Sequence, residues 1–344
     1  MKIVILILTC LFSASLACAS DNIVNVYVWS DMIPDSVIQQ FEKETGIKVN
    51  FSTFDSNETM YAKLRVHQDV GYDIVQPSSY FVERMRKQGM LEKIDQTKIP
   101  NIKNLDPRFL NPAYDPHNEY SLPFIWGTTG IFVNKNYVDP KSIKKWSDVW
   151  DKKYKNQLML LDDSREVFGI ALIVLGYSIN DTNPEHIKQA YLKLKELLPN
   201  IKLFNSDGEI SIMVDEDAEI GMSWDGDFFK AKQENAGLTY IFPQDGFAMY
   251  VDSYAIPKDA PHLANAHRFL NFMLRADIAK EVFLSNHFAS PNLAARKLLP
   301  PDVRNDPTIY PSSAVLRRGQ MQNDIDDDAL ALYEKYWEQL KMGG

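Results

Sequence analysis

Cysteine is the scarcest residue in this 344-residue chain, which has only Cys10 and Cys18. Both lie in an N-terminal stretch with the pattern of a secretion signal, in which Lys2 precedes an apolar run over residues 3–8 and small residues end in an A-x-A arrangement at Ala19. We expect cleavage after Ala19, which leaves no cysteine in the mature chain. That excludes disulfides, thiolate metal sites and a cysteine nucleophile. A chain of about 300 residues buries enough apolar surface to do without disulfides.

Long apolar runs are also missing. A membrane-spanning helix needs about 20 predominantly apolar residues, and Thr9 and Ser13 interrupt the N-terminal run. An uncleaved anchor is therefore disfavoured. Acylation of Cys18 is the other alternative, but Ser15, three positions before it, fits a lipoprotein signal poorly. The expected product is a soluble protein of the periplasm.

Positive charge is in short supply, since 37 Lys and Arg residues face 46 Asp and Glu residues. The net charge is −9, and removal of Lys2 with the signal makes it −10. This balance disfavours nucleic acid and anionic membranes as partners and helps to attract cations. It does not identify a cation site, because many soluble proteins are this acidic.

Enzyme signatures are absent as well. There is no Walker A loop and no G-x-G-x-x-G, and residues 221–226 miss G-x-S-x-G by one position. The six histidines are scattered, and His262 and His267 do not form H-E-x-x-H. Asp163 and Glu166 could serve a glycosidase, but nothing else indicates sugar chemistry. We therefore expect no catalytic residues, no metal and no cofactor.

The chain also has no Pro/Gly-rich linker, internal repeat or low-complexity tract. Its length suggests two domains. Strand and helix patterns alternate from the start, which favours an α/β fold with parallel pairing. The expected strands are residues 24–29, 48–51, 72–75, 130–134, 158–161, 219–223 and 253–256, and the expected helices are 36–45, 58–66, 165–175, 185–197, 207–214, 262–274, 278–285 and 328–341. Because there is no linker, the sequence favours two lobes joined by strands that cross between them over two separate domains in series.

Aromatic residues occur where several expected strands end. Trp29 ends the first strand, Tyr80 follows the third, and Trp224 follows another. In open α/β sheets, ligands bind beyond the carboxyl ends of the strands. Any one ring would more readily be a core residue, but three rings at three strand ends indicate a site.

Acidic residues are interleaved with these rings. Asp163 and Glu166 are three apart at a strand-to-helix junction, which puts both on one side of a helix. Helix capping is the alternative explanation for Asp163, and also for Asp31 and Asp227. Asp252 interrupts a strand expected to connect the lobes, where a charge needs a partner. Carboxylates for ammonium groups and rings for methylenes together suit an organic polycation.

Longer segments carry a family resemblance. At residues 41–49, 55–64, 72–75, 162–168 and 291–297, and over nearly the whole mature length, the chain resembles the spermidine/putrescine-binding periplasmic proteins of polyamine ABC importers. The resemblance implies a type II-like periplasmic-binding-protein fold, with a ligand cleft between two α/β lobes joined by crossing hinge strands. The expected lobes are residues 20–128 plus 252–296 and residues 129–251 plus 297–344, after a signal peptide at 1–19.

The same resemblance implies a ligand-binding site from both lobes. Its expected members are Trp29, Ser30, Asp31, Ser78, Ser79, Tyr80, Asp163, Glu166, Trp224, Asp227, Tyr250, Asp252, Phe288 and Gln322. Asp31 and Asp252 are expected to hold different amines.

The expected pocket mixes features of two branches of the family. Asp227 and the pair Ser30-Asp31 look like the putrescine-preferring branch, whereas Gln322 and the acids of residues 163–166 look like the spermidine-preferring branch. Three further positions depart from relatives: Met32 and Phe288 stand in place of Tyr, and Tyr250 stands in place of Trp. The preferred polyamine therefore stays open.

The expected function is capture of a polyamine and its delivery to an inner-membrane ABC permease, by a monomer that is not an enzyme. A polyamine sensor that docks on a signalling receptor is the alternative. An enzyme acting on polyamines would need a redox or pyridoxal cofactor, for which the sequence has no motif.

Overall fold

The computed structural model describes residues 22–66 and 71–343. The predicted signal peptide, residues 1–19, lies outside the described residues. In the part of the chain that the structure covers, no helix is both long and apolar enough to cross a bilayer.

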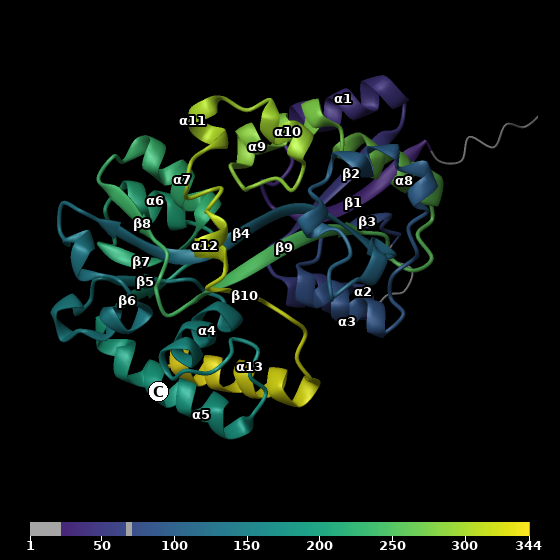
Figure 1. Cartoon of the computed structure of the whole chain (residues 1–344). Helices are drawn as coiled ribbons and strands as arrows, with labels where there is room; N and C mark the ends of the chain where they lie inside the picture. The colour runs from purple at the N-terminus through teal and green to yellow at the C-terminus, as the bar shows by residue number, and fades with distance from the viewer. Residues whose placement is uncertain (1–21, 67–70, 344) are drawn as a thin grey trace, which may run out of the picture.

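The N-terminal part forms a parallel sheet edge covered by helices (Figure 1). β1 pairs in parallel with both β2 and β3. Helix α1 buries Val37 and Phe41, which recur at helical spacing, and ends at Gly46 with a left-handed φ of 70°. The elements are β1 (Ile23–Trp29), α1 (Asp35–Thr45), β2 (Lys48–Phe54), α2 (Asn57–Val66), β3 (Ile74–Val75) and α3 (Ser79–Lys87).

Two long antiparallel strands run between the halves of the molecule. β4 (Ser121–Asn134) and β9 (Phe247–Ala255) pair from Ser121 opposite Ala255 to Thr128 opposite Met249. The strand order is β2-β1-β3-β9-β4-β7-β5-β6, with β8 added beside β4 and β10 added beside β9. Figure 1 shows β4 and β9 spanning the centre of the molecule. They are the crossing strands that the sequence predicted.

The second half repeats the strand and helix alternation around β5, which pairs in parallel with β6 and β7. Its elements are β5 (Leu158–Leu160), α4 (Ser164–Val174), α5 (Pro184–Leu197), β6 (Ile201–Phe204), α6 (Glu209–Val214), β7 (Ile220–Trp224), α7 (Asp225–Glu234) and β8 (Leu238–Ile241). After β9 follow α8 (Leu263–Met273), α9 (Ala276–Asn286), α10 (Leu293–Lys297), α11 (Pro301–Arg304), α12 (Ser313–Leu316), β10 (Gly319–Met321) and α13 (Asp327–Lys341). Short 3-10 helices lie at Gln96–Lys98, Pro100–Asn104, Pro107–Phe109, Pro116–Asn118, Pro140–Ser142, Trp146–Trp150, Lys152–Tyr154 and Leu198–Asn200.

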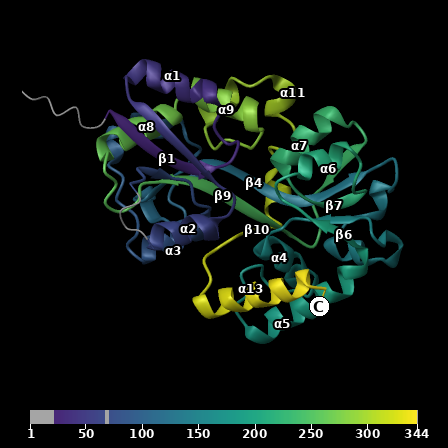
Figure 2. The same cartoon turned by 180° about the vertical axis from the view of Figure 1, so that it is seen from behind.

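Two large hydrophobic cores lie on either side of the crossing strands. One packs β1 and α1 against α8 and α9 around Phe41 and Phe269. The other packs α4, α5 and α13 around Phe168 and Tyr333, whose rings meet edge to face. Figure 2, the view from behind, shows α13 lying against α5 on the far side of the crossing strands from α1. The residue boundaries of the two lobes stay a prediction from the sequence.

The prediction from the sequence underestimated β4 and β9 and missed α3, β6, β8, β10 and α10 to α12. β4 and β9 are longer than the expected segments 130–134 and 253–256, because every residue of β4 and nearly all of β9 are buried and show no alternation. The segment after β3, expected as a loop, begins helix α3 at Ser79. The remaining expected helices and strands occur within a few residues of their predicted bounds.

Candidate ligand-binding site

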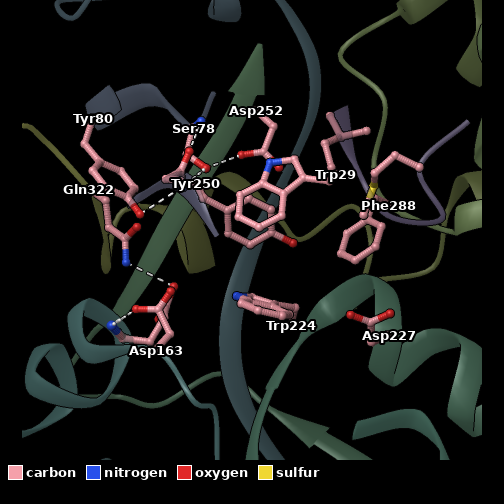
Figure 3. Close-up of a pocket in the computed structure, with 14 residues that line it drawn as sticks. Trp29, Ser78, Tyr80, Asp163, Trp224, Asp227, Tyr250, Asp252, Phe288 and Gln322 are labelled. Atoms are coloured by element: carbon pink, nitrogen blue, oxygen red, sulfur yellow. Dashed lines mark hydrogen bonds between the residues drawn. The ribbon is translucent and has the colours of Figure 1, made fainter. Parts of the chain in front are cut away.

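A cavity lies where the crossing strands meet both halves (Figure 3). The loop after β1, α2 and α3 contribute from one half, and α4, β7 and α7 from the other. The lining contains four carboxylates and no Lys, Arg or His. The lining residues are Trp29, Met32, Asn57, Ser78, Tyr80, Ile125, Asp163, Glu166, Trp224, Asp227, Tyr250, Asp252, Phe288 and Gln322.

Asp252 is held from the first half of the chain. The Ser78 hydroxyl donates to Asp252 Oδ1 at 2.6 Å, and the two residues form an isolated antiparallel bridge. Asn57 Nδ2 lies 3.0 Å from both Ser78 Oγ and the Tyr80 hydroxyl, and Ser78 N–H donates to Asn57 Oδ1 at 3.0 Å. This network fixes the carboxylate of Asp252, through its Oδ1 atom, at the end of the cavity nearest α3.

Asp163 and Glu166 form the opposite end of the cavity. The Glu166 N–H donates to Asp163 Oδ1 at 3.0 Å, so Asp163 caps α4 and also lines the cavity. Gln322 Nε2 donates to Glu166 Oε1 at 3.0 Å. Ser79, which does not line the cavity, donates from its hydroxyl to the Gln322 carbonyl at 2.9 Å. The Asp163 side chain therefore both caps α4 and lines the cavity, so the two explanations offered by the sequence do not exclude each other.

Five aromatic rings line the cavity between these carboxylates: Trp29, Tyr80, Trp224, Tyr250 and Phe288 (Figure 3). Trp29 packs on Phe54, with ring centroids 4.7 Å apart. The Tyr250 hydroxyl donates to Asp225 Oδ1 at 3.3 Å, which orients its ring from behind the cavity wall. Flat apolar faces beside carboxylates suit a chain of methylenes between ammonium groups.

Burial disfavours charge on the carboxylates. Removal from water raises the pKa of Asp252 to about 7, although the Ser78 hydrogen bond lowers it. Burial and the neighbouring Asp163 raise the pKa of Glu166 to about 8. Burial raises the pKa of Asp163 and of Asp227 as well, although both side chains are partly exposed. A cation in the cavity would reverse these shifts, so the site is built for a positive ligand.

The carboxylates stand on three separate elements, α4, α7 and β9. Among residues 22–66 and 71–343, no three or more His, Cys, Asp or Glu side chains are grouped as metal ligands. Separated carboxylates suit a ligand with several separated charges better than a single ion.

Not every predicted residue reaches this cavity. Ser30 and Asp31 line an adjoining space, together with Asp227 and Lys230. Asp31 is exposed, with a left-handed φ of 58°, and it does not cap α1, whose N-cap residue is Pro34. Asp227 does not cap α7 either, since Trp224 occupies that position without a side-chain bond.

Asn57 and Ile125 line the cavity without having been predicted, and so does Met32, which was noted in the sequence only as a departure from relatives. Asn57 begins α2 just after β2, so the rule about strand carboxyl ends would have selected it. Ile125 lies in the wholly buried β4, where no sequence signal separates a pocket residue from a core residue.

Two α/β halves with separate cores, joined by crossing strands around a ligand-sized cavity, define the class of two-lobed solute-binding proteins. Residues 36–311 match the family described as bacterial extracellular solute-binding protein, and the chain belongs to this family. The predicted family and two-lobed fold are therefore confirmed, and so is the prediction of a binding protein rather than an enzyme.

Individual members of this family are similar to the chain over most of its length. The chain is 48% identical over 330 residues to the spermidine/putrescine-binding periplasmic protein of Salmonella typhimurium, covering 96% of this chain and 94% of the relative. It is 33% identical over 349 residues to the putrescine-binding periplasmic protein SpuD of Pseudomonas aeruginosa, covering 96% and 95%. A structure named as a spermidine/putrescine ABC transporter of Listeria monocytogenes superposes with a TM-score of 0.90 at 38% identity, covering 94% and 99%.

Proposed function

We propose that this protein captures a polyamine, spermidine or putrescine, in the periplasm and delivers it to an ABC permease of the inner membrane. One observation carries the proposal: the cavity between the halves is lined by four carboxylates and five aromatic rings but no basic side chain. One relative is named as a spermidine/putrescine-binding protein and another as a putrescine-binding protein. These names support the same ligand class.

The charge of the ligand explains this composition. Aliphatic amines stay protonated up to a pH of about 10, so a polyamine arrives with two or three positive charges. An unpaired buried charge is strongly unfavourable, and each ammonium group therefore needs a carboxylate and further hydrogen bonds. One charge-assisted bond contributes about 1.5–3 kcal/mol, and micromolar affinity corresponds to about −8 kcal/mol. A few such bonds, together with buried methylenes, suffice.

Within the cavity, we assign Asp252 with Ser78 to one ammonium group, and Asp163 with Glu166 and Gln322 to another. Asp227, beside Phe288, is available to a further one (Figure 3). Trp29, Trp224, Tyr250 and Phe288 would enclose the methylenes. Ser30 and Asp31, in the adjoining space, would add to the field that draws the cation inward.

Closure of the two halves around the polyamine would link its capture to its delivery to the permease. Both halves supply carboxylates and rings, so a bound polyamine stabilises the arrangement in which the halves meet. β4 and β9 connect the halves, and bending there would open the cavity. The closed surface would then dock on the permease, with the binding protein acting as a monomer.

The test is isothermal titration of ligand-stripped mature protein with putrescine and with spermidine. Stripping by unfolding and refolding matters because polyamines can copurify. Tight binding of spermidine with weak binding of putrescine would mean that Gln322 and the Asp163–Glu166 pair set the preference. The reverse would assign that role to Asp227. No heat with either ligand would refute the polyamine assignment.

A further inference from the structure

Glu209, at the start of α6, is a buried acid behind the cavity that the site described above does not use. Its side chain is 1% exposed. Neither of its carboxyl oxygens has a hydrogen-bond donor among the described residues. The nearby Ser223 hydroxyl donates to the Trp224 carbonyl at 3.0 Å, and its proximity to Glu209 lowers the pKa of that acid by less than burial raises it. A carboxylate this deep would carry an uncompensated charge, which folded proteins avoid.

The neighbour of Glu209 is Asp227, whose carboxyl group lines the cavity and is within hydrogen-bonding reach of the Glu209 carboxyl. Two ionised carboxylates only accept hydrogen bonds, so a bond between two acids requires a proton on one of them. Two like charges in contact also oppose each other's ionisation. The contact is therefore stable only when the pair shares a proton.

We propose that Glu209 is a positioning residue of the ligand site: it stays protonated at neutral pH, donates that proton to Asp227, and so makes the pair a single negative charge for one ammonium group. The inference rests on the proposed polyamine-binding function. Of the two acids, Glu209 holds the proton because it is buried, whereas Asp227 is partly exposed to the cavity.

The surrounding charges agree with this assignment. Burial raises the pKa of Glu209 well above its usual range, and Asp227 adds to that shift. Burial also raises the pKa of Asp227, while the bond with Glu209 and the charge of Lys230 on the same helix lower it. The other titratable groups facing the pair are acidic or neutral. Glu166 on α4 opposes ionisation of Glu209, and Asp31 from the loop after β1 opposes ionisation of Asp227. Tyr240 of β8 lies near Glu209, and Tyr250 of β9 lies near Asp227.

The variant Glu209→Gln tests the proposal, because glutamine keeps the shape and still donates a hydrogen to Asp227 but cannot ionise. At neutral pH, isothermal titration with the polyamine that binds the wild type should show Glu209→Gln within about threefold of the wild-type affinity, since no charge is lost. Asp227→Asn removes the charge and should weaken binding by about tenfold or more. If Glu209→Gln weakens binding as much as Asp227→Asn does, Glu209 acts as a carboxylate and the proposal is overturned.

A ligand-free measurement separates this inference from the proposed function. The infrared difference spectrum between wild type and Glu209→Gln should show loss of a protonated carboxylic-acid carbonyl band, and loss of carboxylate bands instead would overturn the proposal. If Glu209→Gln does not fold, the same acid band is followed in Asp227→Ala, where loss of the acceptor should shift it, and an unshifted band overturns the shared proton. Failure of the wild type to bind any polyamine would refute the proposed function and leave the infrared result intact.

Discussion

Gln322 Nε2 donates to Glu166 Oε1 at 3.0 Å, a bond between residues 156 positions apart. Gln322 follows β10, and its own carbonyl accepts from Ser79 of α3 at 2.9 Å. A single residue is thus held by helices from both halves of the molecule. The segment after β10 is a third connection beside β4 and β9, and it brings an amide into the ligand site.

Asp252→Asn should weaken polyamine binding by about 1.5–3 kcal/mol, or roughly 10- to 150-fold, because the substitution removes the carboxylate that we assign to one ammonium group. Asp252 is 7% exposed, and Ser78 can still donate to the asparagine oxygen, so the fold should persist. Isothermal titration measures the loss. Asp215→Asn, at an exposed position outside the cavity, is the charge-matched control and should bind like the wild type. An unchanged affinity in Asp252→Asn would remove Asp252 from the site.

The ligand-free protein should lose stability as the pH rises through the range in which the buried acids ionise. The pKa of Asp252 is raised from 3.8 to about 7, so the folded state binds more protons than the unfolded chain between these values. The stabilising contribution of protonated Asp252 is complete below pH 3.8 and disappears by about pH 7. Glu166 adds the same trend from 4.5 to about 8.

This pH dependence is measured as the melting temperature of wild type and Asp252→Asn between the two pKa values of Asp252. The difference between the two proteins isolates the Asp252 contribution from the other titrating groups. The wild type should become less stable relative to the variant as the pH rises. Parallel curves would show that Asp252 is already ionised in the ligand-free fold. Polyamine binding should also tighten with rising pH over this interval, because a bound cation favours the ionised acids.

Arg84→Met should destabilise the third connection. Arg84 is 7% exposed and donates to Asp324 Oδ1 at 3.0 Å, to Asp327 Oδ1 at 2.5 Å and to the Ile325 carbonyl at 2.7 Å. Asp324 is partly buried and Asp327 is exposed, so the loss of these charge-assisted hydrogen bonds should cost about 1.5–3 kcal/mol. Because this segment follows Gln322 directly, we also expect weaker polyamine binding. Chemical denaturation and isothermal titration measure the two effects.

The matched control for Arg84→Met is Asp327→Asn. The Asp327 side chain is 82% exposed, and an exposed ion pair contributes only about 0–1 kcal/mol. Its stability and affinity should therefore stay close to the wild type. A loss in Asp327→Asn equal to that in Arg84→Met would contradict the claim that the partly buried pair of Arg84 with Asp324 is the important one.

Gly226→Ala should disturb the wall of the cavity at Phe288. A Cβ atom at Gly226 would lie 2.5 Å from Phe288 Cδ1, so the ring has to move. Overpacking of this kind costs about 1–3 kcal/mol, against a gain of about 1 kcal/mol from the higher helix propensity of alanine. Polyamine affinity should fall in isothermal titration, since Phe288 lines the cavity.

Gly169→Ala, in α4, is the control for Gly226→Ala. There the nearest atom to an added Cβ is Ile179 Cγ2 at 3.6 Å, an ordinary contact. Its stability should rise by up to about 1 kcal/mol, with unchanged binding. If both variants bind alike, the position of the Phe288 ring does not matter to the ligand.

Local signals in the sequence indicated part of the site. The family resemblance placed Asp163 there, because its position at the start of a helix was equally compatible with capping alone. Trp29 and Trp224 were selected because each stands at the carboxyl end of an expected strand, and both line the cavity. The same reasoning placed Asp31 in the pocket, yet the left-handed turn at that residue leaves it exposed in the adjoining space. A one-residue change of backbone direction is enough to move a side chain out of a cavity, and the residue pattern carries no trace of it.

Glu209 is the reverse case, because the sequence did not single it out and the structure places it next to a cavity residue. In the sequence it is one of many acids in an expected helix at residues 207–214, typical of a solvated first turn. The structure buries it against Asp227, 18 residues later in the chain. The burial follows from the packing of α6 on α7, which local periodicity does not encode.

The sequence by itself determined the α/β alternation, the bounds of helices such as α1 and α5, and the presence of carboxylates at strand ends, because these depend on side-chain periodicity and on capping within a few residues. Only the tertiary structure decided the full length of β4 and β9, the third connection through Gln322, and the set of carboxylates that share one cavity. Those features depend on contacts between residues 100 or more positions apart, such as Gln322 with Glu166 and Ser78 with Asp252. The desolvation that raises the pKa of these acids exists only once such contacts have formed.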